Sequence, residues 1–109
     1  MIQFFHTQAD SYIAVQSKGV LSETEVEKLK WLFSDATPLT EASLSGVFVG
    51  PRKEMITPWS TNAVEITANL GIEGLLRIEE YFPVASEQAE HDSMLQRIYK
   101  GLDQSIFTI

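Results

Sequence analysis

The sequence predicts an α+β sandwich of ferredoxin-like character, in which helices cover one face of an antiparallel-rich sheet. Short apolar runs alternate with segments of helical periodicity, in the order β-β-α-(β)-β-α-β-α-β. Two β-α-β units of similar length, around the first and second helices, indicate a pseudo-repeat. The 109 residues are expected to form one domain, since most domains contain about 50 to 250 residues. The pattern does not determine the order of the strands.

Two strands are predicted at the amino-terminal end of the chain. Residues Met1–Phe5 and Tyr12–Gln16 are apolar and aromatic, and the polar segment Thr7–Ser11 separates them. Runs of this kind, bounded by polar residues, are typical of strands joined by a turn.

The first helix is predicted over residues 23–34. Ser22 and Glu25 have the S-x-x-E spacing of a capping box, in which each side chain bonds the backbone N–H of the other residue. Leu29 and Phe33 recur at helical spacing, so we expect both side chains to face the sheet.

The middle of the chain is predicted to contain a loop and a buried strand. Asp35–Ser45 is rich in Thr, Ser and Pro, which favours a loop with a short strand near Leu39. Gly46–Gly50 is a compact apolar run between glycines, which suit a close backbone approach or positive φ.

The second helix is predicted to begin at Thr57 and Pro58, a helix cap followed by proline at the first helical position. It should continue to about Leu70, with Gly71 at the left-handed position that follows many helices. The apolar residues expected on its buried face are Trp59, Ala63, Ile66 and Leu70.

The last third of the chain is predicted to hold a strand, a third helix and the start of another strand. Leu75–Val84 has the alternation of a strand, with Leu76, Ile78 and Phe82 on one side and Arg77 and Glu79 on the other. Glu87–Ser93 is interpreted as an acidic loop. A helix is expected from Ser93 to Lys100, ending at Gly101. The apolar run Ile106–Ile109 is interpreted as a further strand that the end of the chain interrupts.

Composition excludes several classes of function. The net charge is −7 and no cluster of Lys and Arg is present, which argues against nucleic-acid binding. The chain has no cysteine, so disulfides, thiolate metal sites and a cysteine nucleophile are excluded. No apolar run approaches the roughly 18 residues of a membrane span, and we expect a cytoplasmic protein without a membrane partner.

No catalytic or metal site is expected from the titratable residues. His6 lies on a predicted strand and His91 in an acidic loop, and neither accompanies a nucleophile motif. Glu79 and Glu80 are adjacent on a strand, so their carboxylates should point to opposite faces and cannot form an acid/base couple.

One segment combines cations, hydroxyls and an indole at a helix start: Arg52, Thr57, Trp59, Ser60 and Asn62. The free N–H groups and the positive dipole of a helix amino terminus attract anions. Trp and Arg are also enriched at the centre of protein interfaces. The alternative interpretation is structural: Thr57 caps the helix, Trp59 fills the core and Arg52 is solvated.

The same segment resembles the phosphoribosylformylglycinamidine synthase family in its large single-chain form. The matching residues are Gly50-Pro51-Arg52, Ile56-Thr57-Pro58-Trp59-Ser60-Thr61-Asn62-Ala63, Ile66, Gly71-Ile72 and Arg77-Ile78-Glu79. The likeness extends over essentially the whole chain. P-R-x-x-x-I-T-P-W-S-T-N-A is a long and unusual string, so a chance match is improbable.

The resemblance implies a non-catalytic amino-terminal domain, residues 1–109, of a much longer amidotransferase. The full enzyme converts formylglycinamide ribonucleotide, glutamine and ATP into formylglycinamidine ribonucleotide, glutamate, ADP and phosphate. Its glutaminase domain uses a cysteine, and its synthase domain binds ATP and magnesium. The amino-terminal domain resembles a fused pair of small accessory subunits and packs against the synthase part. The implied partners are therefore the synthase and glutaminase domains, and no cofactor is expected in this part.

Two other functions remain open from the residues. One is a free-standing binding or regulatory module that uses the anion site at the start of the second helix, and the other is a small hydrolase. A reading frame that continues for many hundreds of residues would distinguish the amidotransferase domain from the module. In the amidotransferase, Arg52 is expected to act through a neighbouring domain.

Overall fold

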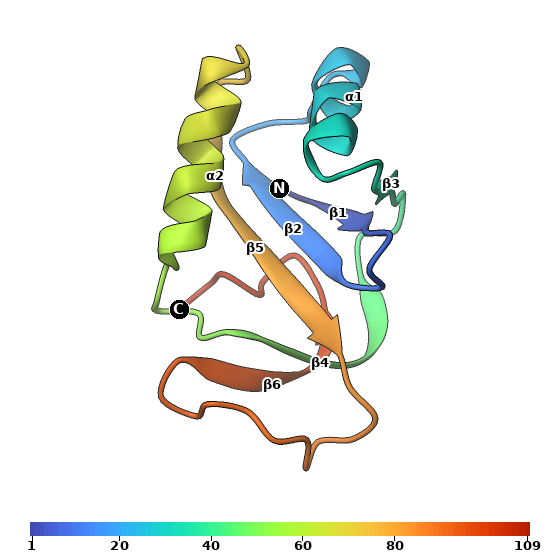
Figure 1. Cartoon of the computed structure of the whole chain (residues 1–109), viewed down its shortest axis with the longest axis vertical. Coiled ribbons are helices and arrows are strands. Elements are labelled where there is room, and N and C mark those ends of the chain that lie inside the picture. Colours follow the sequence, from blue (N-terminus) through green and yellow to red (C-terminus); the bar gives the residue numbers. More distant parts are fainter.

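The computed structural model describes all 109 residues and shows two helices on a six-stranded antiparallel sheet (Figure 1). The elements are β1 (Ile2–His6), β2 (Tyr12–Ser17), α1 (Glu23–Leu32), β3 (Thr37–Pro38), β4 (Leu44–Pro51), α2 (Pro58–Asn69), β5 (Leu75–Pro83) and β6 (Gln96–Leu102). The strand order is β3-β1-β2-β5-β4-β6. The α+β class is confirmed, and the architecture is compatible with a ferredoxin-like sandwich.

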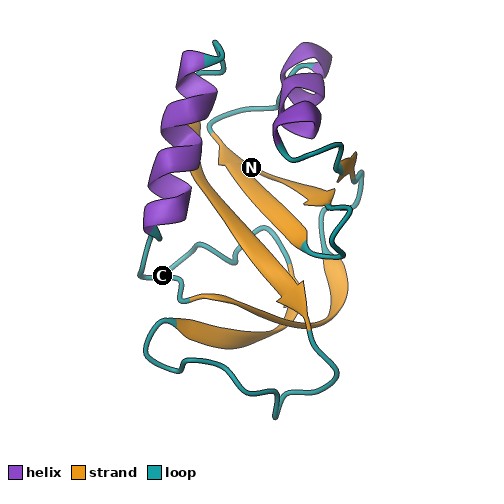
Figure 2. Cartoon of the chain, viewed as in Figure 1, coloured by secondary structure: helices purple, strands orange, loops and turns teal.

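The sheet has a core on each of its faces. Both helices lie on the same side of β1, β2 and β5 (Figure 2). The core beneath them contains Phe5, Ile13, Val15, Leu29, Phe33, Ala36, Ala63, Ile72, Leu75 and Ile78. The opposite core is built by β4, β6 and the carboxyl-terminal turn, and it contains Ile2, Phe4, Ala14, Phe48, Tyr81, Tyr99, Leu102, Ile106 and Phe107. Because β5 is covered on both faces, side chains that point to either side of this strand can be buried.

The predicted capping box is confirmed at the start of α1. The Ser22 hydroxyl accepts from the Glu25 N–H at 3.1 Å, and the Glu25 carboxylate accepts from the Ser22 N–H at 2.9 Å. Leu29 is fully buried and Phe33 is almost so. The helix ends at Leu32, two residues before the predicted end, because Phe33 is its cap and Ser34 and Asp35 adopt positive φ.

The predicted helix over residues 93–100 is wrong, because most of this segment forms β6. β6 pairs with β4 in an antiparallel ladder that gives its backbone groups their hydrogen-bond partners. Local signals favoured a helix, but pairing with a distant strand decides the structure of such a short segment. Gly101 does not end a helix: it has a φ of 85° and lies opposite a register shift in β4, as glycine does at β-bulges.

The run Ile106–Ile109 does not begin a strand. Residues 104–107 form a turn. Ile106 and Phe107 are buried in the core formed with β4 and β6. Their apolar character therefore reflects packing beneath a turn, which an apolar run alone does not distinguish from a buried strand.

The buried face of α2 differs from the predicted one. Ser60, Ala63 and Thr67 are buried, whereas Trp59 is 45% and Ile66 47% exposed. Small side chains allow the helix to approach β5 closely. The Ser60 hydroxyl is near enough to accept the Ile78 backbone N–H at 2.9 Å, and thus satisfies a strand group that β4 does not reach.

The two glycines of β4 have the predicted roles: one adopts positive φ and the other allows a close approach of the backbone. Gly46 has a φ of 123°, which favours glycine over other residues. A Cβ on Gly50 would lie 2.2 Å from the ring of Tyr81, so only glycine lets β4 pass so close to this buried side chain.

The sheet opens between β4 and β5. These strands pair at only two positions, one of which joins Val49 to Phe82. Continuing this register by two residues places Pro51 opposite Glu80. Proline has no backbone N–H to donate, so the ladder does not continue at Pro51. We refer to the opening beyond this point, between Gly50-Pro51 and Glu79-Glu80, as the β4–β5 split.

Two buried phenols next to the split should make stability depend on pH in the alkaline range. Burial raises the pKa of Tyr81 and of Tyr99. A raised pKa in the folded state gives stability that is present below the unfolded pKa of about 10 and is lost as pH rises above it. Urea denaturation between about pH 8 and pH 11.5 should therefore show a falling free energy of unfolding above about pH 10.

The matched variant is Tyr81→Phe, which removes a buried hydroxyl that has no hydrogen-bond partner. It should be at least as stable as the wild type at about pH 8, and it should lose less stability at high pH. An alkaline fall of unchanged size in this variant would show that Tyr81 does not contribute to it.

Candidate functional site

The candidate site begins at the amino end of α2, where Thr57 is the helix cap as predicted. Its hydroxyl oxygen accepts from the Ser60 N–H at 3.0 Å, and Pro58 occupies the first helical position. The cap residue also donates outward to a neighbouring strand. Its N–H and hydroxyl bond the two carboxylate oxygens of Glu79 at 3.2 and 2.6 Å.

Glu79 thus lies where an anion was expected at the helix start. It is 1% exposed and comes from β5, the strand beneath the helix. A carboxylate is stabilised at this end of a helix by the dipole and by the unpaired N–H groups. An external anion would have to approach this buried carboxylate, so the free-standing anion-binding module loses its site.

Arg77 provides the countercharge to Glu79. The two side chains lie on the same face of β5, with Nε of Arg77 2.9 Å from a carboxylate oxygen and both groups almost fully buried. Nη1 and Nη2 of the guanidinium donate to three backbone carbonyls of the loop before α2: those of Lys53 at 2.6 Å, Met55 at 2.9 Å and Arg52 at 3.1 Å. Arg77 and Glu79 together therefore fix the whole segment that leads into α2.

Sequence reasoning missed this pair. The prediction placed Arg77 and Glu79 on one side of the strand, and the structure confirms that they share a face, but it buries them. The available signal was the i, i+2 spacing of opposite charges, which puts two side chains of a strand on the same face. Their burial could not be inferred, because it depends on β4, β6 and the carboxyl-terminal turn covering that face.

The five predicted site residues have different surroundings. Thr57 and Ser60 are engaged with β5. Arg52 is partly exposed, and it bonds Glu54 through Nε at 2.6 Å and the Ser93 carbonyl through Nη1 at 2.9 Å. The Arg52 guanidinium holds the pKa of Glu54 below its usual value. Trp59 and Asn62 are exposed, and both line a hollow between the two helices.

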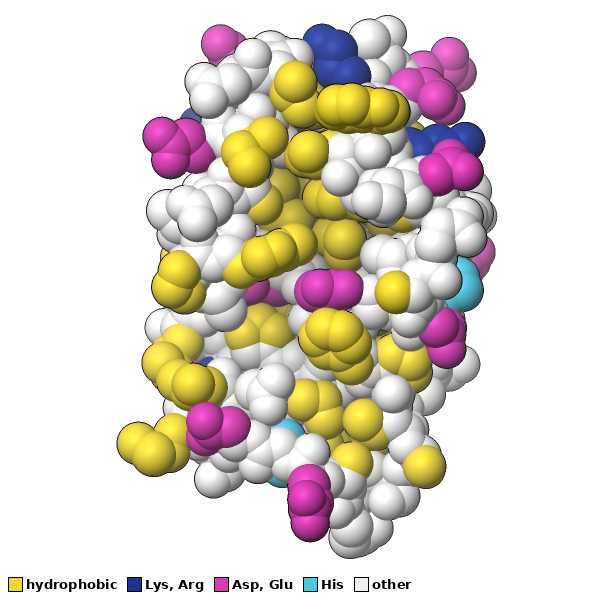
Figure 3. All heavy atoms as spheres, viewed as in Figure 1, with side chains coloured by type: hydrophobic (Ala, Val, Ile, Leu, Met, Phe, Trp, Pro, Cys, Tyr) yellow, Lys and Arg dark blue, Asp and Glu magenta, His cyan; other side chains and the backbone are white.

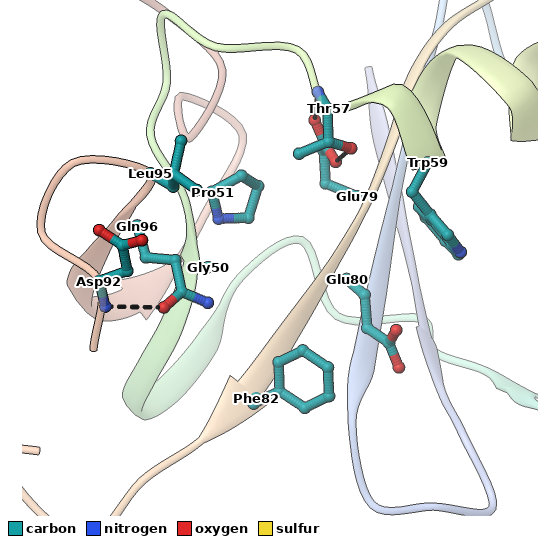
Figure 4. A pocket seen from close by; sticks show the side chains of 10 residues that line it. All are labelled: Gly50, Pro51, Thr57, Trp59, Glu79, Glu80, Phe82, Asp92, Leu95 and Gln96. Carbon is teal, nitrogen blue, oxygen red and sulfur yellow. Dashed lines mark hydrogen bonds between the residues drawn. The ribbon is translucent and has the colours of Figure 1, made fainter. Parts of the chain in front are cut away.

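A pocket of about 460 Å³ occupies the β4–β5 split (Figure 4). Its lining comes from Glu79, Glu80 and Phe82 of β5, Thr57 and Trp59 at the start of α2, the end of β4 and the 92–96 segment. Arg52 holds that last segment through its bond to Ser93. The arrangement offers carboxylates and aromatic rings to an occupant, but no cationic side chain.

Trp59 is common to three neighbouring hollows. Besides the pocket in the split, it lines one hollow between the two helices with Leu32 and Ile66, and another beside the β1–β2 turn with Glu80. Hydrophobic side chains gather along the middle of this face, with acidic side chains at its edges and one among them (Figure 3). We refer to the exposed apolar side chains that line these hollows, Trp59, Ile66, Phe82 and Leu95, as the Trp59 surface.

The structure brings no catalytic constellation together. No group of three or more His, Asp or Glu side chains lies close enough to hold a metal ion. His6 bonds Asp10 and stacks on Tyr12, and His91 bonds the carbonyl of Ala89. Neither helix has the length and apolar character that crossing a membrane requires.

Comparison with known proteins gives one family match. The model of the formylglycinamide ribonucleotide amidotransferase N-terminal domain matches residues 10–106. This stretch includes both helices and every strand except β1. No solved structure matches the chain.

Proposed function

Because the chain belongs to the family of formylglycinamide ribonucleotide amidotransferase N-terminal domains, we propose that it serves as the non-catalytic assembly domain of a single-chain phosphoribosylformylglycinamidine synthase. The family is an amidotransferase family of purine biosynthesis. The proposed enzyme consumes formylglycinamide ribonucleotide, glutamine and ATP, in the cytoplasm. Its glutaminase domain supplies the cysteine nucleophile, its synthase domain binds ATP and magnesium, and this domain supplies a surface on which the synthase part packs.

The observation that supports this role is the Trp59 surface. Trp59 is 45% exposed and Phe82 48%, and both lie beside hollows that a partner can fill. Contiguous apolar surface with a polar rim is typical of protein interfaces, and tryptophan is enriched at their energetic centres. A domain that exists to hold others in place requires such a face.

The other predicted residues have different roles at this interface. Asn62 lies next to Trp59 on the exposed side of α2 and contacts the partner directly. Nη2 of Arg52 makes no hydrogen bond within the chain, so the same guanidinium that holds Ser93 is free to meet a partner carboxylate. Thr57 and Ser60 act indirectly, by fixing the helix that presents Trp59.

Docking is tested by association in trans with the synthase and glutaminase part of the same enzyme. The chain is titrated into the catalytic part, and both binding and glutamine-dependent amidation are measured. Trp59→Ser should weaken association by about tenfold or more, the effect of truncating an interfacial hot spot. The matched control is Trp31→Ser, because Trp31 is 73% exposed on α1 and borders none of the three hollows.

The outcomes separate clearly. The proposal is supported if the wild-type chain associates with the catalytic part, Trp59→Ser weakens that association, and Trp31→Ser leaves the dissociation constant within about twofold of the wild-type value. A wild-type chain that does not associate with the catalytic part, or glutamine hydrolysis by the purified chain alone, contradicts it. Equal losses in the two tryptophan variants would place the interface elsewhere.

A further inference from the structure

We propose that the pocket in the β4–β5 split receives an arginine side chain from the catalytic part of the amidotransferase. This inference rests on the proposed function for the origin of the arginine. It rests on the pocket itself for the chemistry: an unpaired, partly buried carboxylate stands between two exposed aromatic rings.

Glu80 supplies the unpaired carboxylate. Three of the 15 acidic side chains are not exposed: Glu25, Glu79 and Glu80. Glu25 caps α1, and Glu79 is paired with Arg77. Glu80 has no cation within ion-pair distance, and its only hydrogen bond comes from the neutral Ser11 hydroxyl. Ser11 bonds only Oε2 of this partly buried carboxylate, so Oε1 remains without a partner and the negative charge without a cation. Glu80 can therefore accept a charged partner.

The walls of the pocket suit a planar cation. Trp59 and Phe82 lie on either side of Glu80 (Figure 4). Both rings are about half exposed, so each has a face available to an incoming group. A guanidinium stacks on aromatic rings while its N–H groups bond a carboxylate in a fork geometry, whereas an ammonium offers only a point charge.

Another carboxylate of the lining also favours a cation. Asp92 lines the pocket and has no cationic partner within ion-pair distance. Its Oδ1 accepts only the Met94 N–H, at 3.0 Å. A second carboxylate in the lining attracts a cation and disfavours an anionic occupant.

The chain does not fill the pocket with a cation of its own. Its three arginines are engaged elsewhere: Arg52 with Glu54, Arg77 with Glu79, and Arg97 over the ring of Tyr99. None of them lines the pocket. The occupant must therefore come from another polypeptide segment, and charge complementarity selects one that presents arginine on an apolar surface.

The test uses a small probe and a single reporter. The chain has two tryptophans, and Trp31→Phe leaves only Trp59. The tryptophan fluorescence of this variant therefore reports on the pocket. The probe is N-acetyl-arginine amide, and the control ligand is N-acetyl-citrulline amide, which has nearly the same shape but no charge. Titrations at constant ionic strength should show saturable quenching by the arginine probe, and binding of the citrulline probe at least about threefold weaker.

The decisive variant is Glu80→Gln, which keeps the size of the side chain and the bond to Ser11. It should weaken binding of the arginine probe by at least about threefold. Glu65→Gln makes the same charge change on the exposed side of α2, away from the pocket, and should leave binding unchanged. Equal affinities for the two probes, or equal affinities of Glu80→Gln and the parent chain, would overturn the inference.

The two proposals fail separately. If the catalytic part associates with the chain but the arginine probe does not distinguish Glu80→Gln from its parent, docking stands and the arginine pocket is wrong. If the probe binds in a Glu80-dependent way but the catalytic part does not associate, the pocket does bind arginine, but the assembly role and the catalytic part as the source of that arginine are both wrong.

Discussion

Replacing Arg77 with alanine should lower the free energy of unfolding by about 3–5 kcal/mol, the cost of breaking a buried ion pair by removing one partner. Arg77 is 4% exposed, and its loss leaves the carboxylate of Glu79 buried without a countercharge. The carbonyls of Arg52, Lys53 and Met55 lose their donor at the same time. Urea denaturation of the two proteins at neutral pH measures the difference.

Two comparisons make this result specific. Arg52→Ala removes an arginine whose ion pair with Glu54 is about 40% exposed, and such pairs contribute at most about 1 kcal/mol. The double variant Arg77→Ala/Glu79→Ala should cost less than the sum of the two single variants, because it leaves no charge unpaired. If Arg52→Ala lowered the free energy of unfolding more than Arg77→Ala, the loop before α2 would be held mainly by the contacts of Arg52 and not by side chains of β5.

Arg77 also links stability to the proposed function. Its bonds to the 52–55 segment and the bond of Glu79 to Thr57 set where α2 begins, and hence where Trp59 projects. A milder variant, Glu79→Gln, should disturb this segment with less loss of stability, since the amide still accepts one hydrogen bond. The proposed interface would thus be presented by a segment that side chains of β5 hold in place.

Local signals made several elements predictable from the sequence. The first helix could be placed because Ser22, Glu25 and Leu29 act within a few residues of one another. The second helix could be bounded for the same reason, by Thr57 at its start and Gly71, with a φ of 85°, after its end. Caps and glycine stops depend on the local backbone alone, so a single sequence contains the whole signal.

Features that depend on distant segments were not predictable. The segment that forms β6 contains a helical pattern, but its partner strand begins at Leu44, about half the chain away. Ser60 was predicted to contact an anion or a partner at the helix start, and the predicted buried face of the second helix did not include it. Its burial follows from the free N–H of Ile78, a consequence of the β4–β5 split that no local pattern indicates. Glu80 likewise differs from Glu79 only through its surroundings.

Replacing Leu29 with alanine should be the other large loss, about 2–5 kcal/mol, because it empties a fully buried site. Leu29 packs in the core beneath both helices, and the surrounding sheet can only partly close the cavity. The matched change on the same helix is Ser22→Ala, which removes the capping hydroxyl and should cost only about 0.5–2 kcal/mol.

Thermal and urea denaturation of the two variants of α1 distinguish packing from capping as the main source of its stability. Short isolated helices are marginal in water, so most of the stability of α1 should come from its buried face. Because Ser22 is exposed, its loss leaves no unpaired buried group and water can replace the hydroxyl. If Ser22→Ala proved more damaging than Leu29→Ala, α1 would be held mainly by its cap, and the core beneath it would contribute less than its burial implies.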